Sequence, residues 1–136
     1  MIVVDANVAI KWTIIQPLRE KARTLLSETL VAPAMLVSEV TSAIWQYARA
    51  GQVTNQQARQ GIALIISQIA IFEDDADLAV DAFAIGLELG CAPYDCFYLV
   101  SAMRRSAPFV TVDKRFITRV TSTRYSAHVI HLTDWT

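Results

Sequence analysis

Four acidic residues that are far apart in the sequence occupy related positions. Asp5 and Asp113 each follow a short apolar run, so each stands where a β-strand is expected to end. Glu39 and Asp95 lie in the first turns of two expected helices. In an open parallel sheet, the ends of strands and the starts of the helices that follow them face one edge. The four carboxylates are therefore expected to converge at that edge.

A cluster of this kind needs cations. Adjacent carboxylates repel one another and raise one another's pKa unless a divalent ion neutralises them, and hard oxygen donors favour Mg²⁺ or Mn²⁺ over zinc. Divalent ions bind phosphate oxygens, activate a water and stabilise a leaving oxygen, which suits hydrolysis of a phosphodiester without a protein nucleophile. Asn7 and Thr111 each stand two residues from an acid, and we expect their neutral groups to hold a metal-bound water or a phosphate oxygen.

Each acid alone also has a purely structural interpretation. Asp5 and Asp113 are at strand ends, where Asp favours turns, Glu39 is a negative charge near a helix N-terminus, and Asp95 is placed as an N-cap. Local structure explains any one of them. Their joint placement at one predicted sheet edge favours a site.

The basic residues are unevenly distributed, although the formal net charge is only −1. Half of the twelve Lys and Arg residues fall between positions 104 and 124, where Asp113 is the only acid. A negative substrate approaching an acidic pocket needs a positive surface beside it, so part of this cluster is expected to bind a nucleic-acid backbone. The alternative is ordinary solvated surface. The candidates are Arg104, Arg105, Lys114, Arg115 and Arg119.

The elements that would position these residues alternate along the chain. Short, continuously apolar strands between helices predict a parallel sheet covered on both faces, that is, an α/β fold in three α/β/α layers with four to five strands in one domain spanning residues 1–136. Strands are expected at residues 2–4, 31–32, 70–72, 109–112 and 128–132. Helices are expected at residues 8–15, 18–28, 36–50, 54–69, 77–90 and 95–105 and in a basic segment after Asp113.

Composition limits the class of protein. No run of eighteen apolar residues and no leader-like start occurs, and two cysteines, Cys91 and Cys96, are too few for a disulfide scaffold, so a soluble cytoplasmic protein is expected. His128 and His131 point to opposite faces of a predicted strand and are not expected to share a metal.

Three aromatic residues together have more side-chain surface than the core of a domain of this size needs to bury. Trp12, Trp45 and Tyr47 lie on two predicted helices, which we expect to expose an apolar surface to partner proteins. Full burial of all three is the alternative.

Four segments together resemble one protein family. They are IVVDANVAIKW (residues 2–12), APAMLVSEV (32–40), YDCFYLV (94–100) and FVTVDKRF (109–116), and they resemble PIN-domain toxins of the VapC type in order and spacing over nearly the whole chain. The resemblance implies a Mg²⁺- or Mn²⁺-dependent endoribonuclease that acts on RNA, is paired with an antitoxin and is usually homodimeric. By position, Asp5, Glu39, Asp95 and Asp113 match the acidic site of that family, and Asn7 and Thr111 match its neutral companions.

Other interpretations fit less well. A haloacid-dehalogenase-type phosphatase needs a second Asp two residues after the first, where this chain has Asn7. A receiver domain needs an acceptor Asp near the middle of the chain, but no acid lies between Glu39 and Glu73. A PIN nuclease that matures RNA, and a protein-binding module of the same fold without catalysis, both remain open.

Overall fold

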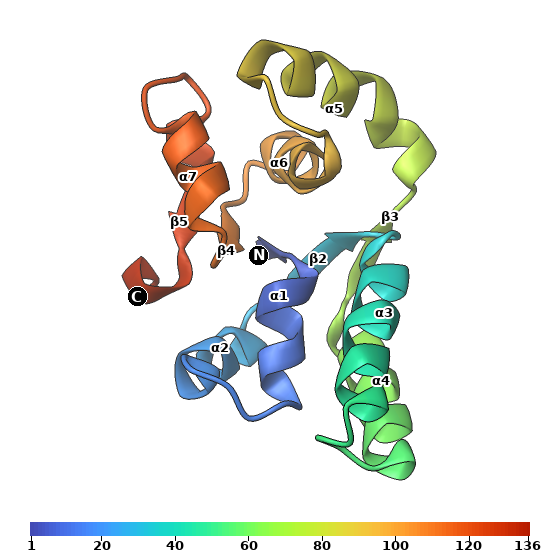
Figure 1. Cartoon of the computed structure of the whole chain (residues 1–136). Coiled ribbons are helices and arrows are strands. Elements are labelled where there is room, and N and C mark those ends of the chain that lie inside the picture. The colour runs from blue at the N-terminus through green and yellow to red at the C-terminus, as the bar shows by residue number, and fades with distance from the viewer.

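Five parallel strands form the centre of the computed structural model, which describes residues 1–136 (Figure 1). The strand order is β3-β2-β1-β4-β5, and all neighbouring strands are parallel. This confirms the predicted α/β fold and parallel sheet. The strands are β1 (Ile2–Val4), β2 (Leu30–Pro33), β3 (Ile71–Glu73), β4 (Phe109–Thr111) and β5 (Val129–His131).

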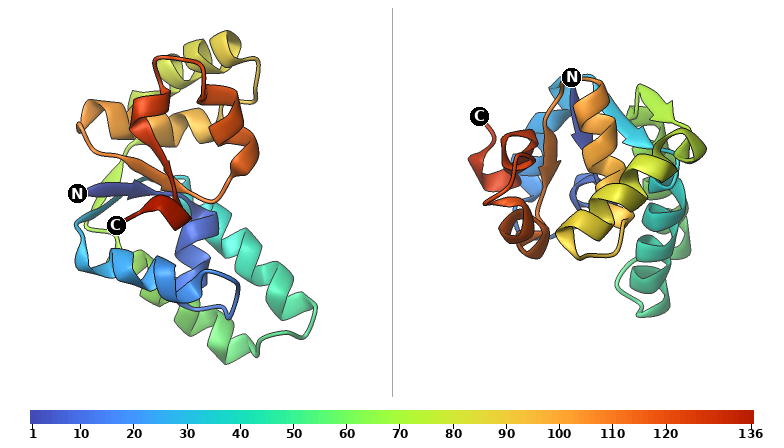
Figure 2. Two further views of the ribbon diagram at one scale, coloured as in Figure 1. Left: turned by 90° about the vertical axis from the view of Figure 1, so that its left-hand side faces the viewer. Right: turned by 90° about the horizontal axis from the view of Figure 1, so that it is seen from above.

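Helices cover both faces of this sheet, which gives the three layers that the sequence predicts (Figure 2). On one side α6 lies against β1, β2 and β4, and α5 packs on the outside of α6. α1 to α4 lie on the other side. The helices are α1 (Ala6–Ala9), α2 (Arg19–Thr24), α3 (Leu36–Arg49), α4 (Asn55–Gln68), α5 (Asp75–Leu89), α6 (Tyr94–Arg104) and α7 (Lys114–Val120), with 3-10 turns η1 (Ile10–Trp12), η2 (Leu25–Ser27), η3 (Ser126–His128) and η4 (Leu132–Asp134).

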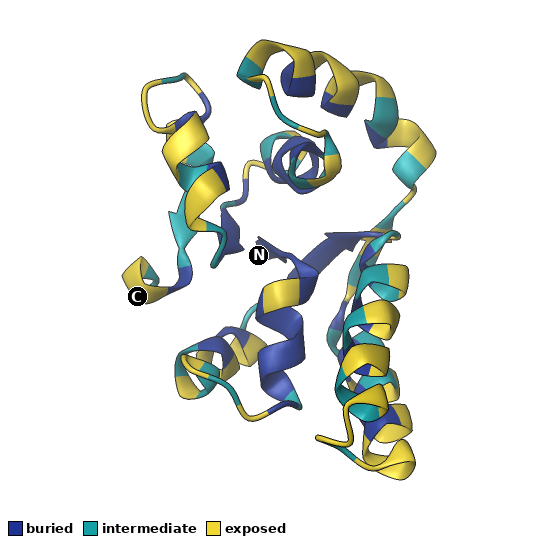
Figure 3. Cartoon of the chain, viewed as in Figure 1, coloured by how far each residue is buried: buried dark blue, intermediate teal, exposed yellow.

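Burial follows the position of each strand in the sheet (Figure 3). The three inner strands β1, β2 and β4 are fully buried, whereas the edge strands β3 and β5 are half-buried or exposed. Inner strands have helices on both faces and a neighbour on both sides, so they consist almost entirely of apolar residues. The acids that follow β1 and β4 therefore project from the buried centre of the sheet.

Side-chain caps set several helix boundaries. Thr54 and Gln57 form the predicted capping box at the start of α4. Asp5 accepts a hydrogen bond from the Val8 amide, so the first helix begins at Ala6 and not at the predicted residue 8. Asp74 accepts the Ala76 amide as the N-cap of α5, so α5 begins at Asp75, two residues before the predicted start.

No single helix is both long and apolar enough to cross a membrane. α5 and α6 reach the necessary length only when taken together, and their axes are bent by 116°.

Candidate functional site

The register of the sheet brings the first acid beside β4. Val4 pairs with Val110, so the next residues along, Asp5 and Thr111, are neighbours across the two central strands. The Thr111 hydroxyl donates a 2.5 Å hydrogen bond to Oδ2 of Asp5, while Oδ1 accepts from the Val8 amide at 3.0 Å. Asp5 is only 4% exposed, and this burial raises its pKa to about 6 despite both hydrogen bonds.

Thr111 also connects Asp5 to Asp113. Its hydroxyl oxygen accepts the Asp113 amide at 3.1 Å, and Oδ1 of Asp113 caps α7 by accepting the Phe116 amide at 3.0 Å. The Thr111 hydroxyl thus uses its proton and one lone pair within the protein. Thr111 is a positioning residue for the two acids, and little of its hydrogen-bonding capacity is left for a water or a phosphate.

Asp95 completes a group of three aspartates. It lies in the first turn of α6, as predicted, and its carboxyl group is within hydrogen-bonding reach of Asp113. The pKa of Asp95 is raised to about 7, mainly by burial and further by its interaction with Asp113 and by the charges of Asp5 and Glu39. The other three predicted acids are therefore close enough to influence the ionisation of Asp95.

Glu39 approaches from α3 and is held by a residue that the sequence analysis missed. The buried Tyr98 hydroxyl donates a short hydrogen bond to Oε1 of Glu39. Burial raises the pKa of Glu39, and the charge of Asp75 adds to this. Tyr98 stands three residues after Asp95 on α6, so helical spacing was the available signal that both residues face the site. No signal in the sequence pointed to Asp75, which accepts the Met35 amide, because it lies in an acid-rich stretch typical of solvated surface.

No cation of the protein is paired with these acids. Lys11 is largely buried and its charge interacts with that of Asp5, but burial lowers the pKa of its ammonium group. Its Nζ donates to Oε1 of Gln16 at 3.0 Å and to the Pro17 carbonyl at 3.1 Å, not to Asp5. The Lys11 charge is therefore directed to neutral acceptors.

The donor types fit a hard divalent cation, but the present positions do not yet form a complete metal site. Carboxylate oxygens without a paired Lys or Arg are the donor set that Mg²⁺ prefers. However, no group of three or more His, Cys, Asp and Glu side chains is placed to hold a metal ion. Asp5, Glu39, Asp95 and Asp113 would have to draw closer together around an ion, and the predicted metal site is not confirmed.

Asn7 departs from the geometry on which its role was predicted. The prediction assumed an extended segment, in which residues 5 and 7 point the same way. Asn7 is instead in α1, because the helix begins directly after Asp5, and its side chain is exposed without a hydrogen bond in the protein. Its contribution to the site stays a prediction.

The predicted basic surface divides into two kinds of residue. Arg104 forms an ion pair with Asp81 at 2.9 Å and Arg105 with Glu73 at 2.7 Å, both at the far end of α6 from Asp95. Arg119 donates to the backbone carbonyls of Leu89 and Gly90 at the end of α5. Lys114 and Arg115 follow Asp113 directly, are exposed and have no partner in the protein.

The aromatic residues also behave differently from one another. Trp12 is 3% exposed and its indole donates to the Ala22 carbonyl, so the expectation that Trp12 lies on a partner surface is wrong. The helical pattern of this segment is short, and its inward face could not be assigned from residue types alone. Tyr47 is half-buried, whereas Trp45 on α3 is 56% exposed.

The comparisons with known proteins agree with this architecture. The crystal structure of PAE2754 from Pyrobaculum aerophilum is similar with a TM-score of 0.72 at 19% identity, and the alignment covers 96% of this chain and 88% of that one. No curated protein sequence matches. The family model of the PIN domain matches residues 2–120, which include all four acids. The chain therefore belongs to the PIN domain family.

Proposed function

We propose that this chain is a Mg²⁺- or Mn²⁺-dependent endoribonuclease, and that it acts in the cytoplasm as the homodimeric toxin of a type II toxin-antitoxin pair. PIN domains are generally nucleases that act on RNA and typically use divalent metals. One observation carries the proposal for this chain: Asp5, Glu39, Asp95 and Asp113 gather at one sheet edge with no Lys or Arg ion pair.

The residues around the acids have separable tasks in this proposal. A bound divalent ion would neutralise the carboxylates and supply an activated water for attack on phosphorus. Thr111 fixes Asp5, and Tyr98 fixes Glu39, so two of the four acids are oriented by neutral donors that leave their negative charge in place. Lys114 and Arg115 are free to hold the RNA backbone at the rim. Arg104, Arg105 and Arg119 would first have to leave the contacts they make within the protein.

The chemistry is tested with the purified chain and a single-stranded RNA. We expect cleavage with Mg²⁺ or Mn²⁺ and none with EDTA. Asp5→Asn keeps an oxygen that accepts the Val8 amide, so the fold should be retained. The substitution removes a negatively charged metal ligand and should lower the cleavage rate at least about 100-fold. Glu88→Gln, at an acid remote from the site, is the matched control and should cleave normally. Cleavage that persists in EDTA would contradict the proposal.

The toxin role needs a test in cells. Expression of the wild-type chain should arrest growth and expression of Asp5→Asn should not, and sequencing RNA ends shortly after induction would reveal the cleaved sites. Co-expression with the product of a small gene directly upstream, encoding a DNA-binding antitoxin, should restore growth. An active ribonuclease that leaves growth unaffected would instead indicate a role in RNA maturation.

A further inference from the structure

One side of α3 carries an unusual set of residues for a helix surface. Ser38, Ser42, Trp45 and Arg49 follow one another at intervals of four, three and four residues, so they form one stripe along the helix, here called the α3 track. α3 starts at the sheet edge that carries the acids and runs away from it (Figure 1). The track therefore leads outward from the acidic site.

Two shallow hollows connect the track to the site. One, of about 390 Å³, is lined by Ser38, Glu39 and Ser42. The other, of about 570 Å³, is lined by the same two serines, by Trp45 and Asp75, and by the apolar Ala34, Met35 and Val37 at the start of the helix. Both hollows are lined by Ser38 and Ser42, so these two serines lie between the Glu39 side and the Trp45 side of α3.

The outer end of the track offers an aromatic plane and a positive charge. The Arg49 guanidinium lies over the Trp45 ring, 5.3 Å from its centroid, and Trp45 is nevertheless 56% exposed. A solvent-exposed indole held by a cation loses little freedom when a further planar group stacks on it. Aromatic planes beside positive charges are what single-stranded nucleic acids bind, because every base has a π-face and every nucleotide a phosphate.

The track differs from the surfaces that proteins use to dock against one another. Apart from Trp45 its residues carry hydroxyl and charged groups, and aliphatic side chains (Met35, Val37) line only the hollow at its inner end. By contrast, α5 exposes Val80, Phe83 and Leu87 at helical spacing, which is an apolar face of the kind that partner proteins cover. Two separate surfaces for two kinds of partner are thus available. The chemistry of the α3 track favours RNA.

We propose that the α3 track holds single-stranded RNA beside the acidic site, with a nucleobase stacked on Trp45 and a backbone phosphate at Arg49. This inference rests on the proposed ribonuclease function. Six residues separate Glu39 from Trp45, which is about 9 Å along a helix. Stacked nucleotides advance about 3.4 Å each, so the stacked base lies about two to three nucleotides from the cleaved bond. Asp75 lies at the acidic end, where a bound cation would offset its repulsion of phosphate.

Binding is measured in the Asp5→Asn chain with Mg²⁺ and a short single-stranded RNA, so that cleavage does not interfere. Trp45→Ala should weaken binding about 10-fold, which equals about 1.4 kcal/mol, and Trp45→Phe should keep most of the affinity because it keeps a ring. Phe83→Ala removes a similarly exposed aromatic residue from α5 and should change nothing. Trp45→Ala should leave the affinity for duplex RNA of the same sequence unchanged.

Two further readouts separate stacking from a structural effect. RNA should quench the tryptophan fluorescence. Trp45→Phe should abolish most of this quenching, because Trp12 is buried and the half-buried Trp135 lies near the C-terminus, on the other side of the molecule from α3 (Figure 1). Arg49→Ala should reduce the slope of log affinity against log salt by about 0.7, as expected for one lost contact to a single strand. In the wild-type chain, Trp45→Ala should raise KM about 10-fold with little change in kcat.

The outcomes distinguish this inference from the function on which it rests. Unchanged RNA affinity in Trp45→Ala, or an equal loss for duplex RNA, would overturn it even if the chain cleaves RNA. Fluorescence that responds to protein concentration but not to RNA would show that a second copy covers Trp45, which also overturns it. If the chain binds RNA through Trp45 but never cleaves it, the track is confirmed and the nuclease proposal fails.

Discussion

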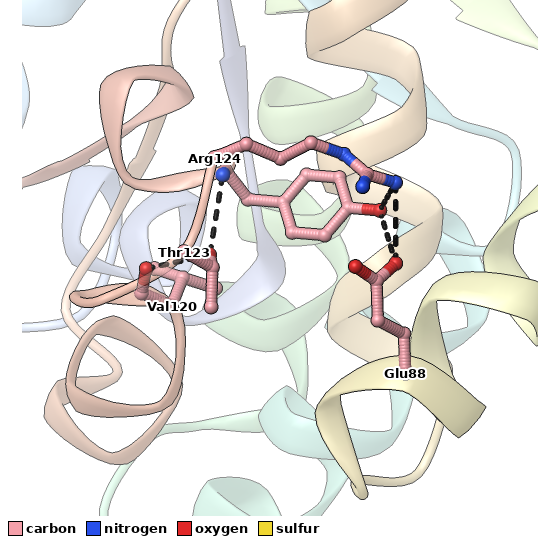
Figure 4. Close-up of polar contacts among 5 residues, drawn as sticks. Glu88, Val120, Thr123 and Arg124 are labelled. Atoms are coloured by element: carbon pink, nitrogen blue, oxygen red, sulfur yellow. Dashed lines mark hydrogen bonds and ion pairs between the residues drawn. The ribbon is translucent and has the colours of Figure 1, made fainter.

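The acidic site at the sheet edge and the outer face formed by α5, α6 and the segment after α7 both contain several carboxylates, but with different partners. On the outer face, Oε2 of Glu88 accepts hydrogen bonds from the Tyr125 hydroxyl at 2.6 Å and from Arg124 at 3.2 Å, and Arg124 also lies over the Tyr125 ring (Figure 4). Asp81 pairs with Arg104 nearby. Glu88 and Asp81 thus each have a cation as a partner.

At the sheet edge, the acids accept hydrogen bonds from neutral donors and interact with one another. Asp5 is bound by Thr111 and a backbone amide, Glu39 by Tyr98, and Asp95 contacts Asp113. An ion pair lowers the energy of a carboxylate within the protein, so it leaves little reason for an external ion to bind. Carboxylates oriented by neutral groups remain uncompensated. The contrast indicates which acids serve the structure and which await a cation.

The largest effect is expected from removing the Thr111 hydroxyl, the neutral group that orients Asp5. Thr111→Val keeps the shape of the buried side chain but removes the proton that Asp5 accepts and the oxygen that accepts the Asp113 amide. Loss of such an orienting partner should lower metal-dependent cleavage about 10- to 100-fold. Thr111→Ser restores the hydroxyl and should recover most of the rate in a cleavage assay. Equal rates for Thr111→Val and wild type would show that Asp5 needs no orientation.

The pH dependence of stability should differ between the two regions. The pKa values of about 6 for Asp5 and about 7 for Asp95 lie above those of an unfolded chain, so the folded metal-free chain binds protons more tightly between pH 4 and 7. Stability should therefore fall as pH rises through this window. Each unit of difference in pKa between the folded and unfolded chain changes the free energy of unfolding by about 1.4 kcal/mol. Even a fraction of the two differences should change the melting temperature by several degrees.

Thermal melts in EDTA at pH 5 and pH 8 test this expectation. The melting temperature should be higher at pH 5, and Mg²⁺ should raise it at pH 8 more than at pH 5, because protons and metal compete for the same oxygens. Asp95→Asn should flatten the profile, whereas Glu88→Gln on the outer face should leave its shape unchanged. A melting temperature in EDTA that increases from pH 5 to pH 8 would contradict the raised pKa values.

Unpaired and ion-paired basic residues should also differ in their contribution to RNA binding. Lys114→Ala with Arg115→Ala should weaken RNA binding and reduce the slope of log affinity against log salt by about 0.7 per lost phosphate contact, with metal binding intact. Arg104→Ala is the matched control, because Arg104 is already paired with Asp81. Titrations at low and high salt measure both slopes. Identical slopes in the double variant and wild type would identify Lys114 and Arg115 as merely solvated residues.

The smallest effect is expected on the outer face itself. Tyr125→Phe removes the hydroxyl that donates to Glu88 and should destabilise the chain by about 0.5–1.5 kcal/mol, measured by urea unfolding, with no change in cleavage. Burial and this hydrogen bond raise the pKa of Tyr125, so the hydroxyl keeps its proton through the neutral range. A loss of cleavage in this variant would mean that the two regions are coupled.

Some features were predictable because their causes are local. The strands ending at Asp5 and Asp113, the capping box at Thr54 and the helices that carry Glu39 and Asp95 all follow from short apolar runs and cap residues. The parallel sheet followed from the alternation of such strands with helices. Boundaries shifted by about two residues where an aspartate capped a helix earlier than the periodic pattern alone indicates.

The sequence by itself determined which residue types stand at the sheet edge, but only the tertiary structure decided their partners. Thr111 contacts Asp5 across 106 residues and Tyr98 contacts Glu39 across 59, through the strand register and the packing of α6. Trp12 is buried and Trp45 exposed for the same reason. A side chain's neighbours depend on how elements cross in space, and periodicity specifies an apolar face without specifying what covers it.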